Sequence, residues 1–135
     1  MPGFTVEKYE RLKESRLSIL SFNCFGGIVS HTLDLPFFSP CINMFFAPYE
    51  AFLDFCEKPR EYFSEPLQFL RMDYNAADKL SYPVYKIRNV EIAMNHYADC
   101  DVAEQKWYER MARINWGNIL WVIQYESLVL WRIVL

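Results

Sequence analysis

Short apolar runs alternate with amphipathic segments along the chain, and this alternation predicts a succession of strands and helices. The apolar run at residues 17–22 is typical of a buried strand. Thr5 is placed to cap a helix over residues 6–14, just before that strand. Further strands are expected at residues 41–46, 66–72, 82–87, 90–95 and 118–125, and further helices at residues 27–35, 49–63 and 101–114. Pro59 is expected to end or kink the helix at 49–63.

The helix expected at residues 101–114 has the clearest period. Its apolar positions recur every three or four residues, as one buried helix face requires. Asp101 is a suitable N-cap, and Glu104 follows it at the spacing of a capping box. The apolar stripe consists of Ala103, Trp107, Met111 and Ile114.

The order of these elements predicts the fold class. Strands that alternate with helices favour an α/β protein, here a Rossmann-like, three-layer open sheet that is mostly parallel. Only Arg88 and Asn89 separate the strands at 82–87 and 90–95, so these strands are expected to add an antiparallel hairpin. The length of 135 residues suits a single domain, and no linker or repeat interrupts the pattern.

Composition and charge narrow the class of partner. Hydrophobic residues make up 53% of the chain and charged residues 23%, which is typical of a folded globular protein. The formal net charge of −3, without a basic patch, argues against a nucleic-acid partner. The aromatic content of 18% is high, and most aromatic residues fall at periodic apolar positions, which favours a core role over a sugar-binding cleft.

The cysteines and the ends of the sequence indicate a cytoplasmic protein. The four cysteines form no CxxC pair and show no structural zinc spacing, so neither a metal nor another cofactor is expected. The N-terminus lacks the apolar core of a signal peptide. The apolar C-terminal segment contains Gln124, Glu126 and Arg132, whose burial in a bilayer is costly, so we expect two strands there and no transmembrane span.

One corner of the sequence, LSFNCFGG at residues 20–27, carries most of the candidate chemistry. It follows an expected strand and precedes an expected helix, where glycines let the backbone approach a ligand closely. The N–H groups of the helix would favour an anion such as a phosphate or a sugar-nucleotide. The corner has neither a GxGxxG pattern nor a Walker lysine, so a plain tight turn is the alternative.

Cys24 in this corner is the candidate nucleophile, and it would need a histidine to assist it. His96 ends an expected strand and would lie at the same sheet edge if that strand runs parallel to the first. His31, within the following helix, is the other candidate. The alternative is an inert buried thiol and a histidine that only forms structural hydrogen bonds.

Glu91 is the candidate acid or base on the expected hairpin, or a metal ligand. It shares a strand face with Asn95. An ion pair with Lys86 or Arg88 across the hairpin is the alternative. No second carboxylate stands where a glycosidase-type pair would need it.

Four segments together resemble a bacterial family known as domain of unknown function nineteen-nineteen, whose members are often labelled exopolysaccharide biosynthesis proteins. The segments are SFNCFGG, SPCINMFF, YPVYKIRNVEIAMNHY and EQKWYERMARINWGNI, and the resemblance covers residues 16–122. The family corner usually reads Ser-Asn-Asn-Cys-Trp-Gly-Gly, so Phe22 and Phe25 depart from it. Asn89 stands where the family usually has an aspartate, which removes a charge.

The resemblance implies roles for the residues that match the family's motifs. Cys24, His96 and Glu91 would be catalytic. The residues implied to bind substrate are Asn23, Gly26, Gly27, Asn43, Tyr97, Asn115 and Trp116. The final SLVLWRIVL does not resemble the usual continuation, so the C-terminal end is expected to be shortened or altered.

The function implied by the resemblance is that of a cytoplasmic transferase in surface-polysaccharide assembly. It would use an acyl, glycosyl or phosphoryl donor, with a small molecule or a sugar-nucleotide as ligand. The alternative is a non-catalytic accessory or partner-binding protein, or a degenerate family member. The oligomeric state stays open at this stage.

Overall fold

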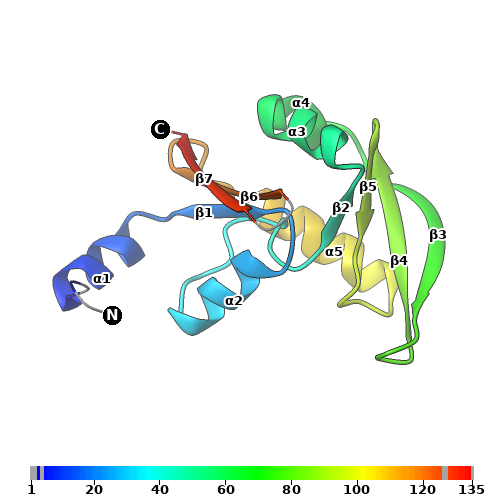
Figure 1. Ribbon diagram of the computed structural model, residues 1–135, viewed down its shortest axis with the longest axis horizontal. Helices are drawn as coiled ribbons and strands as arrows, with labels where there is room; N and C mark the ends of the chain where they lie inside the picture. The colour runs from blue at the N-terminus through cyan, green and yellow to red at the C-terminus, as the bar shows by residue number, and fades with distance from the viewer. Residues whose placement is uncertain (1–2, 4, 126–127, 135) are drawn as a thin grey trace.

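The computed structural model describes residue 3 and residues 5–125 and 128–134, with side chains described up to residue 123. Helices and strands form a mixed α/β fold, which confirms the expected class (Figure 1). In chain order the elements are α1 (Val6–Glu14), β1 (Ser18–Ser21), α2 (Phe25–Thr32), β2 (Phe45–Ala47), α3 (Tyr49–Glu57), α4 (Pro59–Phe63), β3 (Gln68–Asn75), β4 (Leu80–Ile87), β5 (Val90–Ala93), α5 (Cys100–Met111), β6 (Ile119–Tyr125) and β7 (Leu128–Val134).

The strands form two sheets, and this corrects the expectation of one mostly parallel, three-layer, Rossmann-like sheet. In the first sheet β1 lies parallel to β6, and β7 pairs antiparallel with β6. In the second sheet every pairing is antiparallel, in the order β2-β5-β4-β3. The reason is the length of the connections: the β3–β4 and β4–β5 turns are too short for a crossover, so each chain reversal produces an antiparallel neighbour.

Several element boundaries differ from the expected ones. The strand expected at 41–46 is confined to β2, because residues 41–44 form a turn in which the Ile42 N–H donates to Pro40 O. The helix expected at 49–63 is divided at Pro59 into α3 and α4, which confirms the interruption expected at this proline. The N-cap of α5 is Asp99, whose side chain accepts from the Val102 N–H, and not Asp101.

A single buried cluster joins the two sheets. Trp121 on β6 contacts the rings of Phe52 and Phe55 on α3, with centroid separations of 6.4 Å in both cases. Tyr85 on β4 and Trp107 on α5 belong to the same cluster and are fully buried. The aromatic residues therefore supply much of the core, as their periodic placement predicted.

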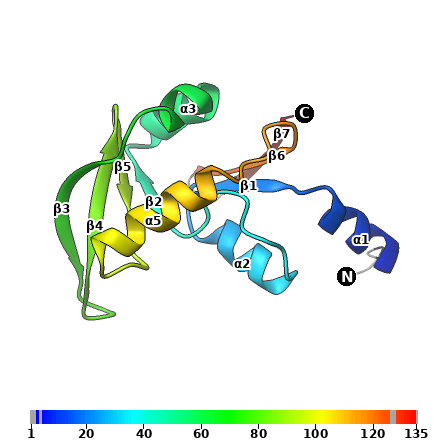
Figure 2. The ribbon, with the colours of Figure 1, turned by 180° about the vertical axis from the view of Figure 1, so that it is seen from behind.

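The helices cover the sheets from different sides. Figure 1 shows α2 on one side of β1 and the α3–α4 pair on the other. Figure 2 shows α5 crossing the second sheet, where the Tyr85 hydroxyl donates to Cys100 O at the start of this helix. β3 is the outermost strand, on the side of the molecule away from α1.

The apolar C-terminal segment forms strands, as expected. β6 and β7 pair antiparallel from Ile119 with Val134 to Tyr125 with Leu128. Within the ranges that the structure describes, no helix combines the length and the apolar character needed to cross a membrane. Glu126 and Ser127, which separate these strands in the sequence, lie outside the described residues.

Candidate functional site

A thiol and an imidazole meet where the two sheets come together. Cys24 follows β1 and is the N-cap residue of α2. His96 follows β5, in a turn that the Tyr97 N–H closes by donating to Met94 O. Cys24 Sγ lies 3.2 Å from His96 Nε2, within hydrogen-bond distance for sulfur. The structure therefore places Cys24 beside His96, while His31 is an exposed residue near the end of α2.

The surroundings of Cys24 favour the neutral thiol. Partial burial is the main cause and raises the pKa of the Cys24 thiol above its ordinary value. A side-chain hydrogen bond from Asn95 opposes this rise because it stabilises the thiolate. Asn95 Oδ1 itself is buried and has no hydrogen-bond partner among the described residues. The Cys24 thiol therefore needs a base to remove its proton before it can act as a nucleophile.

Hydrogen bonds within the protein hold the corner that presents Cys24. Asn23 Oδ1 accepts from the Phe25 N–H at 3.0 Å, and Ser21 Oγ accepts from the Gly26 N–H at 3.0 Å. The Gly27 N–H donates to Ile42 O at 2.9 Å. These three N–H groups were the expected donors for a phosphate or sugar-nucleotide at this corner. In this structure all three instead donate to acceptors within the protein, and anion binding at the corner stays a prediction.

The two glycines allow α2 to pack tightly, a different role from the expected approach to a ligand. An added Cβ at Gly27 would lie 1.8 Å from Asn43 Oδ1. An added Cβ at Gly26 would lie 2.9 Å from Ser21 Oγ and 3.2 Å from Ile42. Real Cβ atoms essentially never come within 3.0 Å of another atom, so a larger residue at either position would force a neighbouring side chain to shift. Asn43, implied to bind substrate, sits against the helix that Cys24 caps.

Glu91 forms its ion pair with Arg71. The expected alternative was an ion pair with Lys86 or Arg88. Two guanidinium nitrogens of Arg71 approach the two Glu91 carboxylate oxygens at 3.0 and 3.3 Å. These hydrogen bonds hold the pKa of Glu91 below its usual value. Glu91 is therefore a carboxylate at neutral pH and is poorly suited to act as a general acid.

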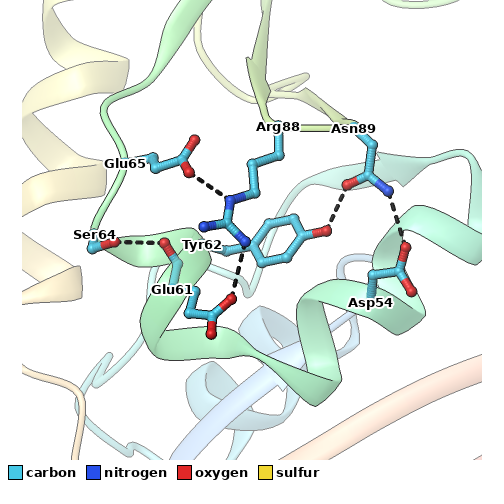
Figure 3. A network of polar contacts seen from close by, with 7 residues as sticks. All are labelled: Asp54, Glu61, Tyr62, Ser64, Glu65, Arg88 and Asn89. Carbon is cyan, nitrogen blue, oxygen red and sulfur yellow. Dashed lines mark hydrogen bonds and ion pairs between the residues drawn. The ribbon is translucent and has the colours of Figure 1, made fainter.

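Arg88 and Asn89 form a polar network that joins the β4–β5 turn to α3 and α4 (Figure 3). Asn89 accepts from the Tyr62 hydroxyl at 2.6 Å and donates to Asp54 at 3.0 Å. Arg88 bonds to two carboxylates, those of Glu61 and Glu65. An amide suits the position of Asn89 because it both accepts and donates, whereas an aspartate would face the Asp54 carboxylate.

Two further residues implied to bind substrate have structural partners. The Tyr97 hydroxyl accepts from Arg110 at 3.1 Å, which ties the turn carrying His96 to α5. Asn115 donates to Ser15 O and Arg16 O and thereby fixes the segment that leads into β1. Both residues support the positions of Cys24 and His96 from a distance.

Trp116 lies away from the thiol–imidazole pair, at a cavity of about 750 Å³ between α3, α4 and β6. The Arg60 guanidinium stacks over its ring at 4.6 Å from the centroid. Neither Cys24 nor His96 lines this cavity. The lining residues are Leu53, Cys56, Glu57, Lys58, Pro59, Arg60, Glu61, Trp116, Ile119, Trp121 and Ile123.

Asn95 and Arg71 are the site residues that sequence reasoning missed. The adjacency of Asn95 to His96 was the one available signal for Asn95. Arg71 gave no signal, because its contact with Glu91 depends on the sheet order. As to metals, nowhere in the described part of the chain do three His, Cys, Asp or Glu residues gather closely enough to hold an ion.

Comparison with known proteins places this architecture in a family. The model of a domain of unknown function (DUF1919) matches residues 2–128. An uncharacterized protein of Haemophilus influenzae is 31% identical over 109 residues, which are 81% of this chain and 50% of that protein. The chain therefore spans about half the length of this relative. Neither description names a reaction, a substrate or a pathway. The match over nearly the whole chain confirms the resemblance, and the protein belongs to the DUF1919 family.

Proposed function

We propose that Cys24 and His96 form a nucleophilic site that transfers an acyl group through a thioester on Cys24. The separation of 3.2 Å between Cys24 Sγ and His96 Nε2 carries this proposal. A nucleophile and a base within hydrogen-bond distance are the minimum that covalent catalysis requires. Of the acyl, glycosyl and phosphoryl donors that the family resemblance implies, an acyl donor suits a thiol best, because attack on its carbonyl forms a thioester.

The reaction would proceed in two half-reactions. His96 Nε2 accepts the Cys24 thiol proton while the sulfur attacks the acyl carbonyl, and the leaving group departs with that proton. An acceptor hydroxyl then attacks the thioester and passes its proton to His96, and Cys24 regains a proton as the sulfur leaves. These half-reactions require the neutral tautomer of His96 that carries its proton on Nδ1, because Nε2 must be free to accept the thiol proton.

The position of Cys24 at the N-cap of α2 supports the negative charge that develops in this reaction. The N-terminal end of a helix carries a partial positive charge of about half an elementary charge. The Cys24 N–H, in the same residue as the reacting sulfur, would be a candidate donor to the carbonyl oxygen of the acyl group during attack. Asn95, through its hydrogen bond to the sulfur, stabilises the thiolate that forms on the way.

Acylation of the protein by an activated ester tests the site directly. The protein is incubated with p-nitrophenyl acetate, and the intact mass and the modified peptide are measured. We expect one acetyl group on Cys24, none on this peptide in Cys24→Ala, and acylation of His96→Gln slowed by about 10²–10⁴-fold. The matched control is Cys100→Ala, which removes another partly buried thiol and should acylate like the natural protein. Equal acylation rates in His96→Gln and the natural protein would contradict the proposed base.

The pathway proposed for this transfer is surface-polysaccharide assembly in the cytoplasm, with a sugar hydroxyl as acceptor. Its support is the label often given to family members. In a host that makes such a polysaccharide, Cys24→Ala and His96→Gln should both lower the yield of acylated polymer while the protein remains folded. Full yield in both variants would remove the pathway role.

A second candidate function is that of a non-catalytic partner-binding protein. The observation in its favour is the raised pKa of the Cys24 thiol, since many catalytic cysteines have a lowered pKa. Thermal unfolding with acyl-coenzyme A and sugar-nucleotides separates the two candidates. A ligand-dependent rise in Tm that Cys24→Ala weakens supports the acyl-transfer site.

A further inference from the structure

β3 is an open edge of the four-stranded sheet. It pairs with β4 on one side, and no described strand pairs with its other side. Figures 1 and 2 both show it as the outermost element, with nothing beyond it. An edge strand of this kind offers a row of backbone N–H and C=O groups to another strand, and proteins usually blunt such edges.

Apolar side chains are exposed along this edge. Phe69, Leu70, Met72 and Tyr74 expose 52%, 39%, 42% and 62% of their surface. Met72 and Tyr74 lie opposite Pro83 and Ser81, so they share the sheet face on which α5 packs. Cys100 Sγ at the start of α5 lies 3.9 Å from Met72 Sδ, which places these two β3 side chains at the margin of that helix.

The charges of β3 are arranged symmetrically about Met72. Arg71 precedes it and Asp73 follows it, and both point to the sheet face opposite the one that bears Met72. If a second β3 strand ran antiparallel with Met72 opposite Met72, each Arg71 would face Asp73 of the partner subunit. In the same register Met72 would face Met72 of the partner subunit, an apolar pair at the centre of the contact. Opposite charges and apolar pairs directly across antiparallel strands are the favourable cross-strand pairs.

From this self-complementarity we propose that two copies of the chain associate through β3 about a two-fold axis at Met72. The two four-stranded sheets then form one continuous antiparallel sheet. A two-fold axis makes the same patch face itself, so a strand whose charges are antisymmetric about its centre is suited to this contact. A parallel, in-register pairing would set Arg71 against Arg71 and Asp73 against Asp73. The repulsion between these like charges disfavours that arrangement. This proposal does not depend on the acyl-transfer proposal.

The register leaves the existing contacts of Arg71 in place. Arg71 bonds to Asp73 at 3.0 Å and to Glu91 at 3.0 and 3.3 Å within the same chain. In the proposed dimer Arg71 keeps these contacts, and its strand position lies directly across from Asp73 of the partner subunit. The irregularity of β3 lies between Phe69 and Arg71, towards one end of the paired stretch, and its centre at Met72 is regular.

Charge reversal provides a test that separates this contact from other modes of association. Sedimentation velocity over a wide range of concentration should show a monomer–dimer equilibrium for the natural protein. Arg71→Asp sets two aspartates against two aspartates, and Asp73→Arg sets two arginines against two arginines. Each variant alone should dimerise about tenfold more weakly, since two favourable cross-strand pairs become repulsive. An equimolar mixture of the two variants restores opposite charges at both positions and should form a heterodimer.

A control variant, a folding check and a second measurement accompany the charge-reversal test. Glu91→Gln removes one of the two intrachain ion pairs that Arg71→Asp removes but keeps Arg71, so it should dimerise like the natural protein. Far-UV circular dichroism shows whether each variant is folded. If Arg71→Asp does not fold, hydrogen exchange of the natural protein replaces it: the β3 amides should exchange more slowly as concentration rises. A natural protein that stays monomeric, reversal variants that dimerise undiminished, or a mixture that forms no heterodimer would overturn the proposal.

Discussion

Residues with the same chemistry have different roles here because their neighbours differ. Cys24 meets His96 at 3.2 Å and lies partly buried, so it can be deprotonated by a base and reached by a substrate. Cys41 is fully buried, and this burial raises the pKa of its thiol well above the usual value, which keeps it inert. Burial and the nearest partner, more than residue type, therefore mark Cys24 as the thiol to test.

The reactivity of Cys24 should depend on pH in a way set by Asn95. Because burial raises the pKa of the Cys24 thiol, its alkylation by iodoacetamide should reach half its maximal rate above the ordinary cysteine value of about 8.5. Asn95→Leu removes the hydrogen bond that stabilises the thiolate, so the midpoint should move to still higher pH. The rate is followed on the Cys24 peptide by mass spectrometry.

The fully exposed thiol of a short cysteine peptide is the reference for this measurement. An unchanged alkylation rate of the Cys56 peptide in the same digests would show that Asn95→Leu has not opened the fold. A Cys24 midpoint below that of the reference peptide would contradict the direction of the shift. A midpoint that Asn95→Leu leaves unchanged would remove the role assigned to Asn95.

At the scale of elements, α2 is held by close backbone packing more than by its own sequence. It has eight residues, too few for a stable isolated helix. It begins with Phe25, Gly26 and Gly27, and glycine is a poor helix former. Its N-terminal turn gains stability because the glycines let it pack against the turn at residues 41–43. The helix that presents Cys24 thus depends on a contact distant in sequence.

Gly27→Ala should therefore destabilise the protein by about 1–3 kcal/mol, the usual range for overpacking. The physical reason is the overlap of the new Cβ with Asn43 Oδ1, at 1.8 Å. The free energy of unfolding is measured with urea. Adding Asn43→Ala removes the overlapping oxygen, so the double variant should be more stable than the sum of the single changes predicts.

Gly117→Ala is the matched control for this series. The nearest atom to its added Cβ is Asn115 Oδ1 at 3.6 Å, an ordinary contact. Its effect should stay within about 0.5 kcal/mol, as for surface substitutions in general. Strict additivity of Gly27→Ala and Asn43→Ala would show that the two side chains do not interact as the structure indicates.

At the scale of the whole molecule, the two sheets share one core and form the candidate site between them. Leu20 on β1, Trp121 on β6 and Tyr85 on β4 belong to a single buried cluster. Cys24 follows a strand of the first sheet, and His96 follows a strand of the second. The distance between sulfur and imidazole therefore depends on how the sheets pack, and any loosening of the core would separate them.

We expect the described part of the chain to unfold as one cooperative unit, in line with the single domain predicted from the length. The urea midpoint from far-UV circular dichroism should coincide with the midpoint from pulse alkylation of Cys41, which is fully buried in the shared core. Tryptophan fluorescence provides a third probe. Separate midpoints would contradict this expectation and indicate that the two sheets unfold independently.

Local features of the fold could be predicted from the sequence because they depend on nearby residues. The helix at α1 with its Thr5 cap, the division at Pro59 and the hairpin turn at residues 88–89 all follow from residues within a few positions of each other. Asp99 and Asp101 lie two residues apart at the start of α5, and only the backbone conformation decides that Asp99 is the N-cap.

What the sequence by itself determined is the order of strands and helices, the apolar positions of the core, and a short set of chemical candidates. Only the tertiary structure decided how the strands pair, that Glu91 binds Arg71, and that Cys24 meets His96. The expected reason for that meeting was a shared parallel sheet, whereas the two residues come from different sheets. The physical reason is that helix caps and apolar periods are encoded locally. Strand partners and sheet packing depend on contacts between residues far apart in the chain, which no local pattern encodes.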